Sequence, residues 1–138
     1  MANLFKLTVH TPEATLLDQE VLSVTAPGAE GYLGVLAHHA PLITALRAGK
    51  LSIRKTDGQM DHYAVGGGFL EVADNHATVL ADSCEHTDSI DVSRAREAEK
   101  RARQFLHARG SRMDSLLAEA ALERALNRIR IREGEGGR

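Results

Sequence analysis

The hydrophobic pattern of this chain changes its period once, close to Ile90, and this change is the strongest constraint on the fold. Before it, apolar residues alternate with polar ones, which is the period of a half-buried strand. Eight of the 12 glycines and all 3 prolines also lie in that part. After it, apolar residues recur at three- and four-residue steps, the period of an amphipathic helix. The sequence therefore predicts a strand-rich N-terminal part and a helical C-terminal part.

The N-terminal part predicts short strands joined by tight turns. Residues 5–10 alternate strictly, and residues 22–26 do the same before Pro27-Gly28 closes the run. Asp57-Gly58 and Asp74-Asn75 each separate two strand-like runs, and such dipeptides favour hairpin turns. These connections are too short for crossover helices. We therefore expect an antiparallel β-sandwich or a flattened barrel.

The C-terminal part predicts two antiparallel helices. Asp91 is a suitable N-cap for the first helix, and Gly110 suits its end. Residues 111–114 can cap the second helix, and a connection of about four residues makes the pair a hairpin. Small residues dominate the expected contact stripes, so each buries little apolar area and the hairpin is lightly held. The stripes are Ala95, Ala98, Ala102 and Phe105 on the first helix, and Ala118, Ala121, Leu122, Ala125 and Ile129 on the second.

Composition and charge bound the class of protein. The chain has 138 residues, enough for one domain with an appendage. Residues 1–90 carry 5 Lys/Arg against 11 Asp/Glu, whereas residues 91–133 carry 11 against 7. The single cysteine, Cys84, excludes an internal disulfide and a multi-cysteine zinc site. No secretory signal or long apolar run is visible, so we expect a soluble, intracellular protein.

No pattern of catalytic or metal-binding residues emerges. The glycines at 66–68 lack the lysine and the strand-to-helix context of a phosphate loop, so a bulge or a close backbone approach is expected. His38 and His39 point to opposite faces if they lie on a strand, and they have no partner at ligand spacing. Cys84 and His86 are too close in sequence for a productive dyad. We expect no enzyme activity and no bound metal.

The arginines of the helical part are the strongest physical signal for binding. Arg94 and Arg101 lie two turns apart on one helix face, and Arg124 and Arg128 lie one turn apart on the next helix. Guanidinium groups match the oxygens of phosphates and carboxylates. A solvated charged face, a nucleic-acid surface, and a site for a nucleotide or an acidic partner all fit the pattern. Nucleic acid is disfavoured because seven carboxylates lie among the basic residues and the helical part has one aromatic residue.

Four segments resemble the epsilon subunits of bacterial and chloroplast rotary F-type ATP synthases, which are equivalent to the mitochondrial delta subunit. They follow the order and spacing of that family, and the resemblance extends over nearly the whole chain. The segments are GVLAHHAPL at 34–42, VGGGFLEV at 65–72, TVLAD at 78–82 and IDVSRA at 90–95. The resemblance implies an α+β fold: an N-terminal antiparallel β-sandwich of about ten strands, then a C-terminal antiparallel two-helix hairpin. The implied divisions are a stalk and c-ring docking domain at 1–88, a regulatory hairpin at 89–133, and a frayed tail at 134–138.

The resemblance also implies a non-catalytic rotor subunit of the central stalk, in the F1 sector. Such a subunit docks gamma to the c-ring and couples proton or sodium ion transport to ATP synthesis. Its hairpin can extend to the alpha and beta subunits of the catalytic head and inhibit ATP hydrolysis. It would be a peripheral protein at the cytoplasmic face of the bacterial plasma membrane, without nucleic acid. The alternative from the residues alone is a free-standing nucleotide-sensing or interaction module that uses the arginines.

The docking surface implied by the resemblance comprises Tyr32, His39, Ala40 and Pro41. Two positions depart from the family pattern. Ala37 stands where proline is common, and Tyr32 stands where many members carry an acidic residue.

The resemblance implies a second set of residues, which would bind ATP as a regulatory ligand; no cofactor is required. The set is Glu85, Ile90, Asp91, Arg94, Ala95, Arg101, Arg124 and Arg128. The phosphates would pair with Arg101, Arg124 and Arg128. The adenine or ribose would lie near Glu85, Ile90 and Asp91.

Overall fold

The structure is a computed structural model that describes residues 3–108 and 112–134. The contacts within the chain divide it into two compact units, Met1–His86 and Thr87–Arg138. The first unit consists of strands, and the second consists of the short 3-10 helix η1 (Thr87–Ser89) and two α-helices. The domain boundary expected after residue 88 thus falls inside η1. The observed boundary lies two residues earlier, after His86.

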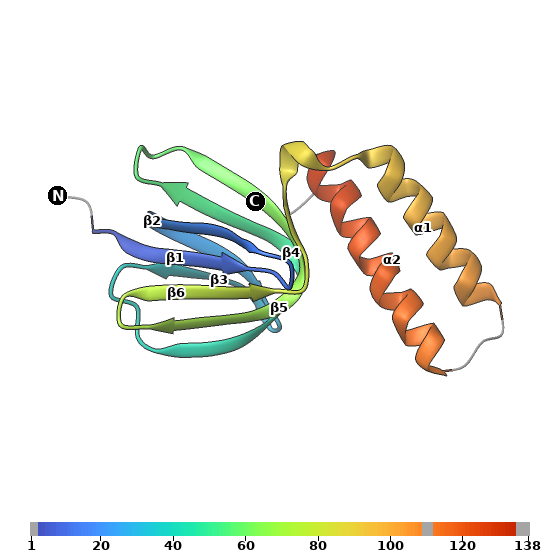
Figure 1. Cartoon of the computed structure of the whole chain (residues 1–138), viewed down its shortest axis with the longest axis horizontal. Helices are drawn as coiled ribbons and strands as arrows, with labels where there is room; N and C mark the ends of the chain where they lie inside the picture. Colours follow the sequence, from blue (N-terminus) through green and yellow to red (C-terminus); the bar gives the residue numbers. More distant parts are fainter. Residues whose placement is uncertain (1–2, 109–111, 135–138) are drawn as a thin grey trace. The chain divides into compact units, whose positions relative to one another are not determined.

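The seven strands of the first unit form one sheet that closes on itself. β1 pairs with both β2 and β6, so the path β1–β6–β5–β4–β2 returns to its start as a flattened barrel (Figure 1). The strands are β1 (Phe5–His10), β2 (Thr15–Gly28), β3 (Gly31–Leu36), β4 (Leu42–Lys55), β5 (Met60–Ala73), β6 (His76–Ala81) and β7 (Cys84–His86). The antiparallel expectation is confirmed apart from β1 and β6, which run parallel. These two strands are far apart in sequence, so no hairpin fixes their relative direction.

Three long strands take part in both layers of the sandwich. β2, β4 and β5 each have 14 residues. β5, for example, pairs with β7 through residues 63–65 and with β6 through residues 68–73. If each long strand is counted once per layer, the unit has the roughly ten strand segments that the family resemblance implied.

The core between the layers is almost wholly aliphatic. Its fully buried side chains include Leu7, Ile53 and Leu70. In β2 the alternation observed in the sequence is interrupted, because the pairing with β4 shifts between Val21 and Ser23. As a result Val21 is buried, whereas the predicted inward residue Leu22 is only half-buried. A bulge of this kind moves side chains to the other face of a sheet.

The turns and the glycine run follow the predictions from sequence. The Asp57-Gly58 turn joins β4 to β5, and the Asp74-Asn75 turn joins β5 to β6. Asp74 and Asn75 have φ of 51° and 58°, the backbone of a type I′ hairpin turn. Gly68 has φ of 140°, and a Cβ there would collide with the Leu80 carbonyl. The close backbone approach expected for this run is therefore confirmed.

The second unit is an antiparallel pair of helices (Figure 1). They are α1 (Val92–His107) and α2 (Arg112–Arg132), and neither is long and apolar enough to cross a membrane within the described residues. Asp91 is the N-cap of α1 as predicted, because its Oδ1 accepts a hydrogen bond from the Arg94 amide at 3.1 Å. The predicted roles of Gly110 and Ser111 lie outside the described residues, as does the tail at 135–138.

Small residues dominate the contact between the two helices. Ala95 and Ala102 of α1 and Ala118 and Ala125 of α2 are buried, as the stripes predicted. Phe105, the last member of the predicted α1 stripe, also faces α2, but it lines an open groove between the helices and is 45% exposed. Phe105 lies in the last turn of α1, beyond the last buried alanine of that helix.

Candidate functional site

Three of the four implied docking residues lie in the loop between β3 and β4. The loop begins with a turn in which the His39 amide donates to the Leu36 carbonyl at 3.2 Å. The third residue of this turn, His38, has φ of 64°, which is uncommon outside glycine. Ala40 and Pro41 are exposed. The loop therefore presents a small apolar surface on a sharply turned backbone.

The imidazole of His39 is fixed inside this loop. Its Nδ1 lies 2.6 Å from the Ala40 carbonyl oxygen, and a carbonyl can only accept a hydrogen bond. Nδ1 therefore carries the proton and donates it. In the neutral ring Nε2 is then the acceptor nitrogen.

Asn75 joins the β3–β4 loop to two other segments. Its Oδ1 accepts from the His38 amide at 2.7 Å, and its Nδ2 donates to the Leu4 carbonyl at 3.0 Å. Its own carbonyl accepts from the Lys6 amide at 3.2 Å. The sequence predicts Asn75 only as a turn residue. No sequence signal pointed to a bond between residues 37 positions apart.

Tyr32, the fourth implied docking residue, lies apart from the other three. It is at the first end of β3, and the β3–β4 loop follows the other end of that strand. Its hydroxyl accepts a hydrogen bond from the Lys50 amide at 3.0 Å, and its side chain is 48% exposed. Tyr32 thus stabilises the contact between β3 and β4, and the structure does not bring it together with His39.

Several residues implied to bind ATP have structural roles at the start of α1. Asp91 caps the helix, while Ile90 and Ala95 are buried at 6% and 3% exposure. Glu85 lies in β7 of the sandwich unit. The IDVSRA motif therefore also encodes the beginning of a packed helix.

The four arginines are distributed over both helices. Arg94 and Arg101 are exposed on α1, and Arg124 and Arg128 are half-buried on α2. An open, largely apolar groove of about 390 Å³ runs between the helices. It is lined by Ala98, Arg101, Ala102, Phe105, Asp114, Leu117, Ala118 and Ala121. Of the four arginines, Arg101 alone lines this groove in the described part of the chain, so the groove does not gather the predicted set.

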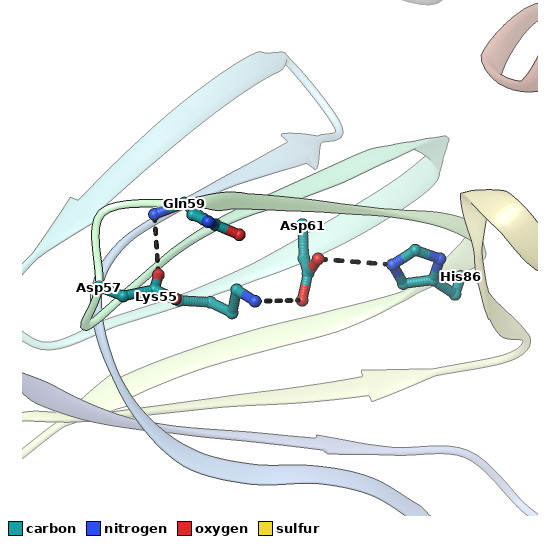
Figure 2. A network of polar contacts seen from close by, with 5 residues as sticks. All are labelled: Lys55, Asp57, Gln59, Asp61 and His86. Carbon is teal, nitrogen blue, oxygen red and sulfur yellow. Dashed lines mark hydrogen bonds and ion pairs between the residues drawn. The ribbon is translucent and has the colours of Figure 1, made fainter.

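A polar network missed by the sequence analysis lies at the edge of the sandwich (Figure 2). The Asp61 carboxylate is 3.5 Å from His86 Nε2 and 3.8 Å from Lys55 Nζ. The rings of Tyr63 and His86 meet edge to face at 5.0 Å. Asp61 and His86 come together because Tyr63 pairs with His86 in the β5–β7 ladder. This network fastens β7, the last strand, to β5.

Burial shifts the pKa of two groups near this network, His62 and Cys84, toward their neutral forms. Burial, together with Lys50, lowers the pKa of His62, although Asp61 acts in the opposite direction. Burial and then Glu85 raise the pKa of the Cys84 thiol to about 11. A thiol with that pKa is protonated at neutral pH and is a poor nucleophile. Among residues 3–108 and 112–134, no three His, Cys, Asp or Glu side chains form a metal-ligand cluster.

Both units match the models of one protein family. Residues 4–87 match the beta-sandwich domain of the ATP synthase delta/epsilon chain, and residues 88–133 match its long alpha-helix domain. The chain belongs to the ATP synthase delta/epsilon chain family. The resemblance inferred from the four sequence segments is therefore confirmed, and so is the fold of a β-sandwich followed by two helices.

Relatives in the delta/epsilon family match this chain from end to end. The ATP synthase epsilon chain of Desulforamulus reducens is 46% identical over 133 residues, which are 96% of this chain and 100% of the relative. That of Moorella thermoacetica is 46% identical over 94% of this chain and 96% of its own length. A chain in the structure of the Euglena gracilis mitochondrial ATP synthase OSCP/F1/c-ring assembly superposes with a TM-score of 0.76 at 26% identity. The match covers 88% of this chain and 76% of that one.

Proposed function

We propose that this chain is a non-catalytic central-stalk subunit of a rotary ATP synthase. It connects the gamma subunit to the membrane-embedded c-ring and so couples ion flow through the ring to ATP synthesis. The observation that carries this proposal is the end-to-end match of both units to epsilon chains. The chain in the Euglena F1/c-ring assembly, with a similar fold over most of its length, supports it.

In this proposal the β3–β4 loop is the docking element of the sandwich. Ala40 and Pro41 are exposed there, and His39 is fixed by its bond to the Ala40 carbonyl. A preformed loop loses little conformational freedom when it binds. The loop would contact the polar loops of the ring, and the complex would hold the chain at the cytoplasmic face of the bacterial plasma membrane.

The helical unit is proposed to regulate the complex. The contact between α1 and α2 consists largely of alanines. An alanine has a single methyl group, and burying it stabilises the contact by only about 0.8 kcal/mol. Such a contact permits the helices to rearrange and to reach the alpha and beta subunits of the head, where they would inhibit ATP hydrolysis. ATP would act as a regulatory ligand of this unit, with Arg101 as the first residue to test.

Docking is tested by binding of the full chain to ring and gamma prepared from cells that lack it. Ala40→Lys places a long charged side chain on the exposed loop and should weaken binding. Ala14→Lys is the matched control, because Ala14 is also exposed but lies in the turn between β1 and β2, away from all four implied docking residues in the sequence. Equal binding by the two variants would contradict the docking role of the loop.

Regulation is tested by the rate of ATP hydrolysis of the catalytic head with the full chain or with a version that ends at Ser89. Faster hydrolysis with the shorter version is expected if the helices inhibit. Both versions must first be shown to bind gamma. Equal rates would contradict the inhibitory role.

A further inference from the structure

The end of the sandwich that carries the docking loop also concentrates unusual backbone conformations. Among the described residues, the only ones with positive φ that are not glycine are His38, Asp74 and Asn75. His38 lies in the β3–β4 loop, and the other two form the β5–β6 turn. Asparagine and aspartate tolerate this conformation better than other side chains, and two consecutive ones fit a type I′ turn. His38 has φ of 64° as the third residue of the turn closed by the bond from the His39 amide to the Leu36 carbonyl, a position that takes positive φ in type II and type I′ turns.

The bond from the His38 amide to Asn75 holds this turn from outside the loop. At 2.7 Å it is short, and it joins two turns that are separated by 37 residues. The other half of the Asn75 amide donates to the Leu4 carbonyl at 3.0 Å. Only one orientation of the amide group satisfies both partners, since an amide hydrogen needs the oxygen and a carbonyl needs the NH₂ group. The side chain is therefore fixed at both ends.

We infer that Asn75 is a positioning residue for docking: it holds the β3–β4 loop in the shape that binds the polar loops of the ring. The inference rests on the proposed function and assigns a role to a residue outside the docking stretch. Asn75 need not touch the partner. It acts through the His38 backbone, and the turn that begins at Leu36 then carries Ala40 and Pro41 into place. Without the bond, the loop would have to be ordered at the moment of binding, which weakens association.

Three substitutions separate this role from a general effect on folding. Asn75→Gly removes both side-chain bonds but keeps the positive φ, and Asp-Gly is a favoured pair for a type I′ turn. Asp74→Gly is the matched control, because Asp74 is the neighbouring turn residue with φ of 51°. Asn75→Asp keeps an oxygen acceptor for the His38 amide, loses the donor to Leu4, and places a carboxylate oxygen against the Leu4 carbonyl.

The experiment measures the dissociation constant of each full-length variant for ring and gamma that lack this chain, together with its thermal unfolding. Asn75→Gly should bind about tenfold more weakly, which corresponds to 1.4 kcal/mol and to the upper range for one hydrogen bond. Asp74→Gly should bind within about twofold of the unmodified chain, and Asn75→Asp should bind more tightly than Asn75→Gly because it keeps the bond to the His38 amide. The exchange rate of the His38 amide in the free chain should rise in Asn75→Gly and stay slow in Asn75→Asp.

The outcomes distinguish this inference from the proposed function. Tight binding by Asn75→Gly, or an equal loss in Asp74→Gly, would overturn the positioning role alone. Binding by Asn75→Asp that is no tighter than binding by Asn75→Gly, although its His38 amide still exchanges slowly, would also overturn it. Failure of the unmodified chain to bind would overturn the proposed function and this inference with it.

Discussion

Gly68 provides a stringent test of the folded sandwich. It lies in β5 opposite Ala81 of β6, with φ of 140°. A Cβ at this position would collide with the Leu80 carbonyl and would come within 2.9 Å of the Ala81 Cα. Both neighbours are backbone atoms, so they cannot move aside as a flexible side chain would. Gly68→Ala should therefore destabilise the sandwich strongly.

The expected size of the effect follows from two separate costs. Forcing an extra group into a packed site costs about 1–3 kcal/mol. Holding alanine at a φ that only glycine adopts easily costs about 1–3 kcal/mol more. We expect a loss of about 3 kcal/mol or more in the free energy of unfolding. For a domain of this size this corresponds to a fall of about 12–24 °C in the unfolding midpoint.

Gly34→Ala is the matched control in the same unit. Gly34 lies in β3 without a positive φ, and a Cβ there meets nothing within 4 Å. This substitution should change stability by no more than about 0.5 kcal/mol.

Tyrosine fluorescence during urea unfolding is a suitable assay. The chain has 2 tyrosines and no tryptophan, and both tyrosines, Tyr32 and Tyr63, lie in the sandwich unit. The signal therefore follows that unit without a contribution from the helices. Equal midpoints for Gly68→Ala and Gly34→Ala would refute the close approach of β5 and β6.

Three further predictions concern single residues. Asp91→Ala should lower the free energy of unfolding of the helical unit by about 1 kcal/mol, because α1 loses its N-cap. The measurement is thermal unfolding followed by helical circular dichroism, with Ser93→Ala as a control that should change little. An equal loss of stability in both variants would argue against capping. Because burial raises the pKa of the Cys84 thiol, this thiol should react slowly with a disulfide reagent at pH 8 and faster as the pH approaches 11. Rapid reaction of the folded chain at pH 8 would contradict the burial of Cys84. The lowered pKa of His62 means that the folded state binds its proton less well than the unfolded state does. His62 therefore leaves stability unchanged above about pH 7 and lowers it as the pH falls below the ordinary histidine value of about 6.5. A His62 titration midpoint at or above that value, measured by NMR, would contradict the sign.

Local rules were sufficient to predict much of the fold from the sequence. Strict alternation located β1, and Asp57-Gly58 located a hairpin, because side-chain period and turn chemistry act over a few residues. The Asp91 cap was predictable for the same reason. The burial of Val21 in place of Leu22 could not be predicted, because it results from a bulge, and a bulge depends on the partner strand.

In the candidate sites, too, features set by neighbouring residues could be predicted from the sequence, and features set by distant residues could not. The residues of the proposed docking loop were named from the sequence, their docking role stays a prediction, and the arrangement of the loop depends on contacts that the sequence does not display. His38 bonds to Asn75 across 37 residues, and His86 contacts Asp61 across 25. Such pairs are set by strand register, which emerges only when the whole sheet closes. The arginine set was located correctly on its helices, and its binding of ATP stays a prediction.

In the proposed function, this chain couples ion flow to ATP synthesis without chemistry of its own. The most direct test uses inside-out membrane vesicles from cells that lack it, with ATP synthesis driven by an imposed ion gradient. We expect little synthesis in these vesicles and recovery when the purified full chain is added back. Full synthesis without the chain, or no recovery with it although it binds the complex, would contradict the account.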